Sequence, residues 1–211
     1  DFDDGARLAG SDDEEDYINA LAAFYREICD ITPQNTGLGD YDLLEYKVVW
    51  IITGIDDALN ETISSDDLQT LSAYMAGGGS VFWEGADAGY DYSIEDDTPE
   101  RDFFNLFGAE YVDDGRSRTA GNVQDLRGSR SFFEQGPVQI DYRYRETGDT
   151  RVDEFNTTFG RLIMRSQEDP APEVSRIRMI AAEEGNYRSV LSSVYLGSMI
   201  DDAGTNTRYN V

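Results

Sequence analysis

The residue types that usually carry out catalysis are scarce in this chain of 211 residues. It contains no histidine, so the usual general base and the usual metal-binding imidazole are both absent. Cys29 is the single cysteine, which excludes a disulfide framework, a thiolate metal cluster and a redox pair within the chain. Cys29 also falls near the end of an expected helix, where a thiolate is not stabilised. The chemistry left to the chain is that of carboxylates.

Four aspartates are expected near the carboxyl edge of a sheet, where open α/β folds bind ligands. They are Asp3, Asp4, Asp87 and Asp91. Oxygen ligands suit Ca²⁺ or Mg²⁺, but no loop shows the alternation of a calcium motif, and solvated acids are the preferred interpretation. A carboxylate pair also suits glycoside hydrolysis, although among 43 acidic residues some pair lies close by chance. We therefore expect no catalytic residue, no cofactor and at most weak binding of a divalent cation.

The net charge is strongly negative, because 43 acidic residues face 17 basic ones and give a formal charge of −26. Such a surface repels phosphate, which argues against nucleic acid and anionic lipid as partners. Lys47 is the only lysine. Many short carboxylates with almost no lysine are typical of a surface adapted to high salt. A GC-rich genome would explain the arginines but not the excess of aspartate, so we expect a halophilic protein.

Four arginines gather in one loop-rich stretch, namely Arg116, Arg118, Arg127 and Arg130. On so acidic a chain they are expected to pair with an acidic surface, either its own or that of another subunit. This stretch is the best indication in the sequence of self-association or of docking to a protein partner.

Two features bear on location. Asn60-Glu61-Thr62 and Asn156-Thr157-Thr158 have the pattern of N-glycan acceptors and are expected in loops. No segment approaches the ~20 apolar residues of a membrane span, and no basic-then-apolar leader opens the chain, which fits a mature or trimmed segment. We expect an extracellular or cell-surface location without membrane insertion.

The first half of the chain begins with a helix and a buried strand. Ser11 and Glu14 have the spacing of a capping box, which predicts a helix over residues 12–28 with one apolar face. The continuous apolar and β-branched stretch over residues 47–53 predicts a strand that is buried on both faces. Such a strand belongs inside a sheet that helices cover on both sides.

The next elements continue this alternation. Ser64 or Ser65 can cap a helix that should stop at Gly77–Gly79, and residues 80–84 predict a second buried strand. The order strand, helix, strand with short connections predicts a parallel βαβ unit. Thr98 followed by Pro99 should start a further helix.

The second half is less regular. Residues 109–112 predict a short strand that closes onto the sheet, and the stretch 113–156 is rich in Gly, Arg and Asp. Strict alternation over residues 138–144 predicts a half-exposed strand inside it. Residues 161–165 and 177–181 are later strand candidates. Residues 187–200 fit either a strand and a helix or two strands.

These elements predict an α/β fold with three layers, in which helices cover both faces of a parallel sheet. Residues 113–156 are expected to be a β-rich insertion, and the length fits a single domain over residues 1–211. A doubly wound domain should open with a strand, yet only an acidic turn over residues 1–5 precedes Ser11. Either the first strand lies upstream, or the chain is a segment of a longer protein.

Several pieces resemble one known family. They are the apolar strand ending in Thr53-Gly54, the helix ending in Gly77-Gly78-Gly79, and the run SVFWEGADAGYD over residues 80–91. Residues 46–91 thus resemble the class I glutamine-amidotransferase-like, flavodoxin-like domains of secreted multidomain proteins, including some immune-inhibitor-A-like metallopeptidases. Residues 103–112 fit the same pattern, and residues 1–5 (DFDDG) resemble the acidic turn after the family's first strand.

The resemblance also implies what the chain lacks. In catalytic relatives of this fold, a nucleophile sits in a tight Gly-x-Cys-x-Gly turn between strand and helix, with a histidine and an acid as partners. The corresponding turn here is Gly85-Ala86-Asp87-Ala88-Gly89. Asp87 stands where the cysteine would be, and no histidine is present to activate a nucleophile. The resemblance therefore implies a non-catalytic member of the family.

Together these points predict a non-enzymatic structural or interaction domain of an extracellular or cell-surface protein. The alternative is an accessory domain of a secreted hydrolase, such as a peptidase, whose catalytic centre lies outside this chain.

Overall fold

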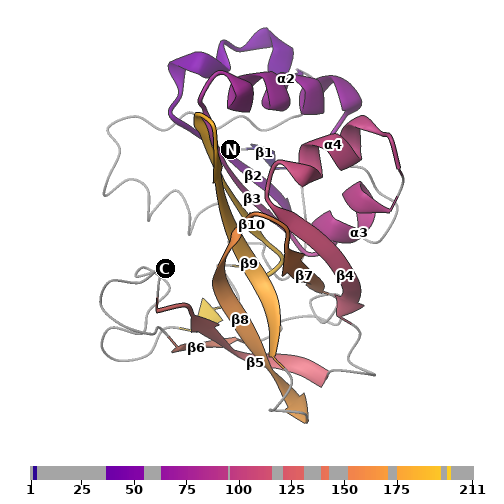
Figure 1. Ribbon diagram of the computed structural model, residues 1–211, viewed down its shortest axis with the longest axis vertical. Helices are drawn as coiled ribbons and strands as arrows, with labels where there is room; N and C mark the ends of the chain where they lie inside the picture. The colour runs from indigo at the N-terminus through magenta and orange to yellow at the C-terminus, as the bar shows by residue number, and fades with distance from the viewer. Residues whose placement is uncertain are drawn as a thin grey trace.

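The computed structural model describes residues 2–3, 37–54, 63–94, 96–115, 121–130, 139–142, 152–170, 175–195 and 199–200. The helical elements within these ranges are the 3₁₀ turns η1 (Leu38–Asp40) and η2 (Leu43–Glu45) and the helices α2 (Ser65–Ala76), α3 (Ala88–Ser93) and α4 (Pro99–Asn105). The strands are β1 (Phe2–Asp3), β2 (Val48–Gly54), β3 (Ser80–Gly85), β4 (Ala109–Gly115), β5 (Gly121–Gly128), β6 (Gln139–Tyr142), β7 (Val152–Thr157), β8 (Arg161–Pro170), β9 (Ser175–Glu184), β10 (Tyr187–Ser192) and β11 (Met199–Ile200). All the described strands belong to one mixed sheet (Figure 1).

One part of the sheet is parallel. Strands β1, β2, β3 and β10 lie side by side in that order, and each neighbouring pair is parallel. Val81 of β3 is in register with Val49 of β2 on one side and with Ser189 of β10 on the other. Helices α2 and α4 lie beside this part of the sheet, toward one end of the molecule (Figure 1).

The other part is antiparallel. From β10 the sheet continues through β9, β8, β5, β6 and β11, and β9 also carries a branch in which β7 pairs with β4. β9 and β10 form a hairpin around Gly185, whose φ of 59° is accessible to glycine without strain. Register shifts in the β4–β7, β5–β8 and β8–β9 pairs increase the local twist and help the sheet to curl.

The predicted three-layer α/β fold with a parallel sheet is wrong. The described chain is mostly β and forms a curled, mixed sheet with few helices. The physical reason lies in the connections. No described helix follows α4, so within the described residues the strands from β4 onward are not joined by crossover helices, and β9 reaches β10 through a short hairpin, which enforces antiparallel pairing. The flavodoxin-like and class I glutamine-amidotransferase-like architecture predicted from the sequence is corrected accordingly.

The local elements of the first half are confirmed. β2 and β3 fall on the predicted strands and pair in parallel. The Ser64 hydroxyl accepts a hydrogen bond from the Asp67 N–H and caps α2, which ends before Gly77. The Thr98 hydroxyl caps α4 in the same way, with Pro99 in the first turn. The predicted helix over residues 12–28 lies outside the described residues.

The structure also defines the strands of the second half of the chain and the strand at its start. Residues 109–112 do form a strand, but β4 pairs antiparallel with β7 rather than joining the parallel strands. β6 shows the expected alternation, since Ile140 and Tyr142 are buried and their neighbours are exposed. Residues 187–200 contain two strands, β10 and β11. The acidic start of the chain includes a strand, because β1 pairs with β2. The described strands of residues 113–156 belong to the same sheet as the rest, and their status as an insertion stays a prediction.

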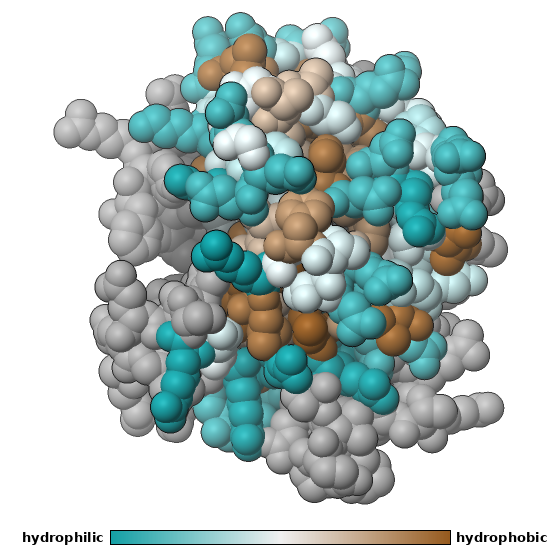
Figure 2. All heavy atoms as spheres, in the orientation of Figure 1, coloured by the Kyte–Doolittle hydropathy of each residue, from teal (hydrophilic) through white to brown (hydrophobic). Residues whose placement is uncertain are grey.

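Two buried apolar clusters hold the fold together. The first lies between the parallel strands and helices α2 and α4, and Trp83, fully buried, is at its centre with Tyr92, Phe103 and Phe107 around its ring. The second lies against the antiparallel strands and includes Leu126, Met164 and Tyr195 among its fully buried members. The face seen in Figure 2 is largely hydrophilic, with apolar residues gathered toward its middle. None of the described helices is both long and apolar enough to cross a membrane.

Candidate functional site

The turn after β3 is where the family resemblance would place a nucleophile. β3 ends at Gly85, and α3 starts at Ala88 with Asp87 as its N-cap residue. Gly85 packs so closely that a Cβ there would come within 2.1 Å of the Thr53 hydroxyl oxygen. A Cβ at Gly89 would lie 2.8 Å from the Phe155 ring. Both glycines are thus explained by close packing, with no need for a ligand.

The first backbone N–H groups of α3 already have an acceptor. The carboxylate of Asp153, at the start of β7, accepts hydrogen bonds from the N–H of Gly89 at 2.6 Å and of Tyr90 at 2.9 Å through its Oδ2 atom. The Asp153 N–H in turn donates to the Ala86 carbonyl at 2.9 Å. Asp153 is 0% exposed, so its carboxylate and its backbone N–H, both shielded from water, fasten β7 to the two sides of the turn.

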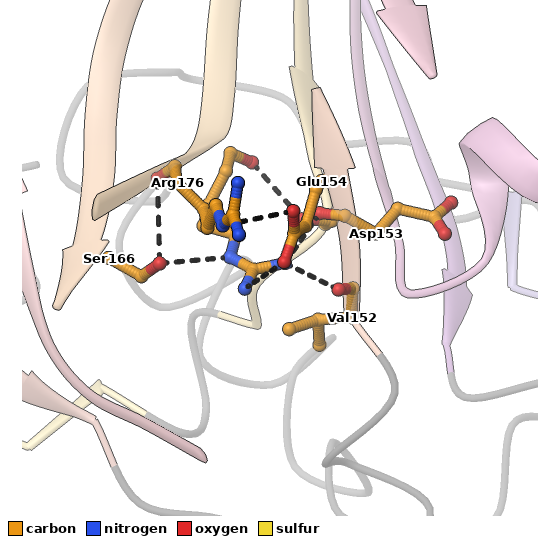
Figure 3. A network of polar contacts seen from close by, with 7 residues as sticks. Val152, Asp153, Glu154, Ser166 and Arg176 are labelled. Atoms are coloured by element: carbon orange, nitrogen blue, oxygen red, sulfur yellow. Dashed lines mark hydrogen bonds and ion pairs between the residues drawn. The ribbon is translucent and has the colours of Figure 1, made fainter. Parts of the chain in front are cut away.

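A buried arginine anchors the same segment of β7 from the other side (Figure 3). Arg178 of β9 is 1% exposed, and its Nη1 donates to the carbonyls of Val152 and Asp153 at 2.5 and 2.9 Å. Its Nε donates to the Ser166 hydroxyl at 3.0 Å. Its Nη2 lies 3.7 Å from Oε1 of Glu154. We call these four partners and Arg178 the Arg178 clamp.

The clamp extends to the surface and to β10. Glu154 Oε2 lies 3.1 Å from Nε of Arg176, whose side chain is 40% exposed. The Ser193 hydroxyl, just after β10, donates to the Asp153 carbonyl at 2.7 Å. Figure 3 shows the Asp153 carboxylate turned away from the arginines, so the two acids of β7 serve opposite sides of the strand. Glu154 binds the arginines, whereas Asp153 binds the turn before α3.

The carboxyl ends of β2 and β3 are filled by internal contacts as well. The Thr53 hydroxyl donates to the Glu84 carbonyl at 3.2 Å and accepts a hydrogen bond from the Trp83 indole N–H at 3.2 Å. Glu84 is 1% exposed. A substrate approaching this edge would meet buried protein groups that are already engaged with one another.

One carboxyl of the neighbouring helices has a shifted pKa. Burial raises the pKa of Glu100, but hydrogen bonds from its own backbone N–H and from the hydroxyls of Ser65 and Thr98 outweigh burial and lower this pKa below its ordinary value. The Ser65 hydroxyl donates to Glu100 Oε1 at 2.8 Å and so joins the first turns of α2 and α4. This carboxylate is structural, because it ties two helices together.

The four aspartates expected to gather at the sheet edge are not brought together as a metal site. Asp3 is in register with Ile52 on β2. Asp87 is at the N-cap position of α3 without a side-chain capping hydrogen bond, and Asp91 lies one turn later in that helix, with its N–H donating to the Asp87 carbonyl at 2.8 Å. Asp4 lies outside the described residues. Among the residues that the structure describes, no group of three or more acidic or cysteine side chains is arranged to hold a metal ion.

The remaining candidates are spread over the chain. Asn156 is exposed near the end of β7, in a strand rather than in the expected loop. Arg127 lies on β5 and Arg130 just beyond it, and both are exposed. The other candidates, Cys29, Asn60, Arg116 and Arg118, lie outside the described residues.

Sequence reasoning missed the residues that define this site, namely Asp153, Glu154 and Arg178. The one signal for Arg178 was its place inside the apolar run of residues 177–182, where a lone arginine needs buried partners. Nothing in the sequence indicated that Asp153 and Glu154 are buried, because adjacent acidic residues in an acidic chain are typical of an exposed surface.

Comparisons with known proteins bear on the fold. No family model matches the sequence, and neither does any curated protein. The fold is similar to part of a β-galactosidase from Rahnella sp. R3, with a TM-score of 0.58 and 12% identity over 96% of this chain and 26% of that chain. It is also similar to part of a β-galactosidase from the Antarctic haloarchaeon Halorubrum lacusprofundi, with a TM-score of 0.51 and 16% identity over 79% of this chain and 21% of that chain.

A third solved structure, the mmIFT52 N-terminal domain, is similar over almost its whole length. The TM-score is 0.59 at 11% identity, over 99% of this chain and 90% of that chain. The chain spans about a quarter of the length of the glycosidases to which it is similar. At these identities the likeness establishes a shared fold and leaves activity open.

Proposed function

We propose that this chain is a non-enzymatic domain that acts through contacts with other proteins, in an extracellular or cell-surface protein adapted to salt. The observation that carries the proposal is the position of the Asp153 carboxylate at the start of α3. It supports a non-catalytic role because the N–H groups of Gly89 and Tyr90, at the start of α3, already donate to a protein carboxylate.

Acyl-transfer chemistry at a strand-to-helix turn needs an exposed nucleophile beside free N–H groups that stabilise a developing oxyanion. Asp87 takes the nucleophile's place in the turn and is only 9% exposed. The N–H groups of Gly89 and Tyr90 donate to Asp153, so a substrate oxygen would have to displace a buried carboxylate. The aspartate at the nucleophile position, the lack of histidine in the sequence and the carboxylate bound at the start of α3 together support a scaffold or recognition role.

The proposal is tested by assaying the purified chain in molar salt against nitrophenyl esters, anilides and nitrophenyl glycosides. We expect rates equal to those of buffer alone. A matched pair of variants, Asp87→Asn and Asp91→Asn, separates real activity from a contaminant. Turnover that Asp87→Asn abolishes and Asp91→Asn preserves would contradict the proposal.

A second candidate is an accessory domain of a secreted hydrolase whose catalytic centre lies outside this chain. It is favoured by the likeness to a part, about a quarter, of two β-galactosidases. The genomic sequence on both sides of the chain decides between the candidates. A neighbouring hydrolase domain, such as one with a zinc-protease motif, would favour the accessory role, whereas repeats or a surface anchor would favour the structural role.

A further inference from the structure

Charge is divided unequally along the chain. Twenty-nine of the 43 acidic residues precede residue 116, whereas thirteen of the 17 cations lie at or after it. In the fold, η1, η2, α2 and α4 lie toward one end of the molecule, and β5, β6 and the end of β8 lie toward the other (Figure 1). The described helices α2 and α4, from the acid-rich part of the sequence, thus lie toward the opposite end of the molecule from β5, which carries Arg127 (Figure 1).

The helical end presents a set of exposed carboxylates. We define the acidic end as six exposed residues from η1, η2, α2, α4 and the turn before α4, namely Asp40, Asp42, Glu45, Asp66, Asp97 and Asp102. The cations described in this half are Lys47 and Arg101, and Arg101 already binds Asp96 and the Ser93 carbonyl. The acidic end thus carries a large excess of negative charge.

At the opposite end, two arginines face the same side of adjacent strands. Arg127 of β5 is directly opposite Arg165 of β8 in the antiparallel register, and both are exposed. Their neighbours Leu126 and Ser166 are buried, which fixes the arginines on the outer face of the sheet. We call Arg127 and Arg165 the arginine pair.

The arginine pair is only partly neutralised. Arg127 Nε lies 3.4 Å from Asp125 Oδ1, and its side chain is still 55% exposed. Arg165 makes no hydrogen bond or ion pair with any residue that the structure describes. Like charges directly opposite each other destabilise a sheet, so this arrangement is unfavourable until an external carboxylate lies between the two guanidinium groups.

We propose that the arginine pair docks onto the acidic end of a second copy of this chain. Asp125 of the same copy neutralises part of the arginine pair, and the acidic end, which lies toward the far end of the molecule, offers further carboxylates to a second copy. Because two different surfaces meet, the contact is head-to-tail and leaves one surface of each type open, which produces open-ended oligomers. This proposal deepens the proposed interaction role and rests on it.

The proposed association should depend on salt, because long-range repulsion between copies and short-range ion pairs at the contact are screened at different salt concentrations. At low salt, copies of net charge −26 repel one another over long distances, because the Debye length is ~30 Å at 0.01 M. The short guanidinium–carboxylate contacts are weakened only when the Debye length approaches ~3 Å, near 1 M salt. Association is therefore expected to pass through a maximum between about 0.1 and 1 M salt. A hydrophobic contact would instead strengthen steadily with salt.

The test is sedimentation velocity of the purified chain over this salt range, with circular dichroism to confirm that each sample is folded. The double variant Arg127→Gln with Arg165→Gln is expected to raise the dissociation constant about tenfold or more. The matched control is Arg188→Gln, which removes an exposed cation that already pairs with Glu183 at 3.3 Å. It is expected to leave association unchanged.

A mixing experiment tests the head-to-tail geometry. The variant Asp66→Asn with Asp102→Asn weakens the acidic end but keeps the arginine pair, so each double variant retains one intact surface. Mixed together, the two should form a one-to-one complex that grows no further. The proposal is overturned by a wild-type chain that stays monomeric at every salt concentration, by equal loss in the Arg188→Gln control, or by a mixture that stays monomeric. A monomeric chain would leave the activity assays of the proposed function untouched.

Discussion

Replacing Arg178 by methionine tests whether the Arg178 clamp holds β7 in place. Methionine keeps much of the length and apolar volume of the arginine stem, so the change chiefly removes the guanidinium group. The carbonyls of Val152 and Asp153 and the Ser166 hydroxyl then lose a donor, and Glu154 keeps only Arg176 of its two arginines. All of these groups are buried except Arg176.

The magnitude follows from these losses. Removing one partner of a buried ion pair typically costs about 3–5 kcal/mol, because the remaining charge is left without compensation. Arg176, at 3.1 Å from Glu154, retains part of that compensation, whereas three further buried acceptors lose a hydrogen bond worth roughly 1 kcal/mol each. We expect Arg178→Met to lower the free energy of unfolding by about 4 kcal/mol, a large part of the roughly 5–15 kcal/mol of a typical domain.

The assay is urea unfolding followed by circular dichroism at a fixed salt concentration of about 2 M, which screens the exposed charges. A double-mutant cycle with Glu154→Gln measures the coupling energy between the Arg178 guanidinium and the Glu154 carboxylate. Glu154→Gln should recover part of the loss in the Arg178→Met background, because no carboxylate is then left buried without its arginine. The control is Arg188→Met, whose exposed pair with Glu183 should contribute at most about 1 kcal/mol.

Two results would refute this reasoning. One is a loss below about 1 kcal/mol for Arg178→Met, which would mean that water replaces the guanidinium without cost. The other is strict additivity of Arg178→Met and Glu154→Gln, which would mean that the two side chains are not coupled.

Three further predictions concern single contacts. Asp153→Asn should lower the free energy of unfolding by about 1–2 kcal/mol and speed hydrogen exchange at the Gly89 amide, because a charged acceptor becomes a neutral one. Unchanged exchange would contradict this hydrogen bond. Ser64→Ala removes the cap of α2 and should cost about 1 kcal/mol in thermal or urea unfolding. Because the folded pKa of Glu100 lies below its ordinary value of 4.5, its contribution to stability is full above that pH and is lost as the pH falls through the folded pKa. Ser65→Ala should raise that pKa in an NMR titration, and no change would remove Ser65 as a cause.

The elements that the sequence predicted correctly are those whose signals are local. The Ser64 cap, the glycines after α2 and the apolar runs of β2 and β3 each specify structure within a few residues. Capping and turn chemistry act over one helical turn, so reading them needs no knowledge of the rest of the fold. The parallel pairing of β2 and β3 followed from the helix between them.

The sheet order could not be read in the same way. β10 inserts beside β3, so Ser189 faces Val81 across more than a hundred residues of sequence. The alternation that places a strand in a sheet does not name its neighbour, so the sequence did not reveal that β10 lies between β9 and β3. Extending the parallel βαβ pattern of residues 47–84 to the whole sheet made the predicted architecture wrong.

The sequence predicted which catalytic residue types the turn after β3 lacks, and the structure adds the carboxylate that binds there. The absence of histidine and the aspartate at position 87 could be read from the chain. The carboxylate that occupies the start of α3 comes from β7, a strand 64 residues further along than Gly89, so no local pattern reveals it. A contact of this kind becomes visible only when the tertiary pairing of β4 with β7 is known.

Acidic residues therefore have two separate roles in this molecule. Asp153 and Glu154 are buried and bonded to backbone N–H groups or arginines, so salt screens them little and their contribution should persist across ionic strengths. The exposed carboxylates of the acidic end interact through solvent, and their effect depends on salt. Under the proposed function, the buried carboxylates hold the turn before α3 in place, and the exposed carboxylates of the acidic end form the charged surface on which another protein would dock.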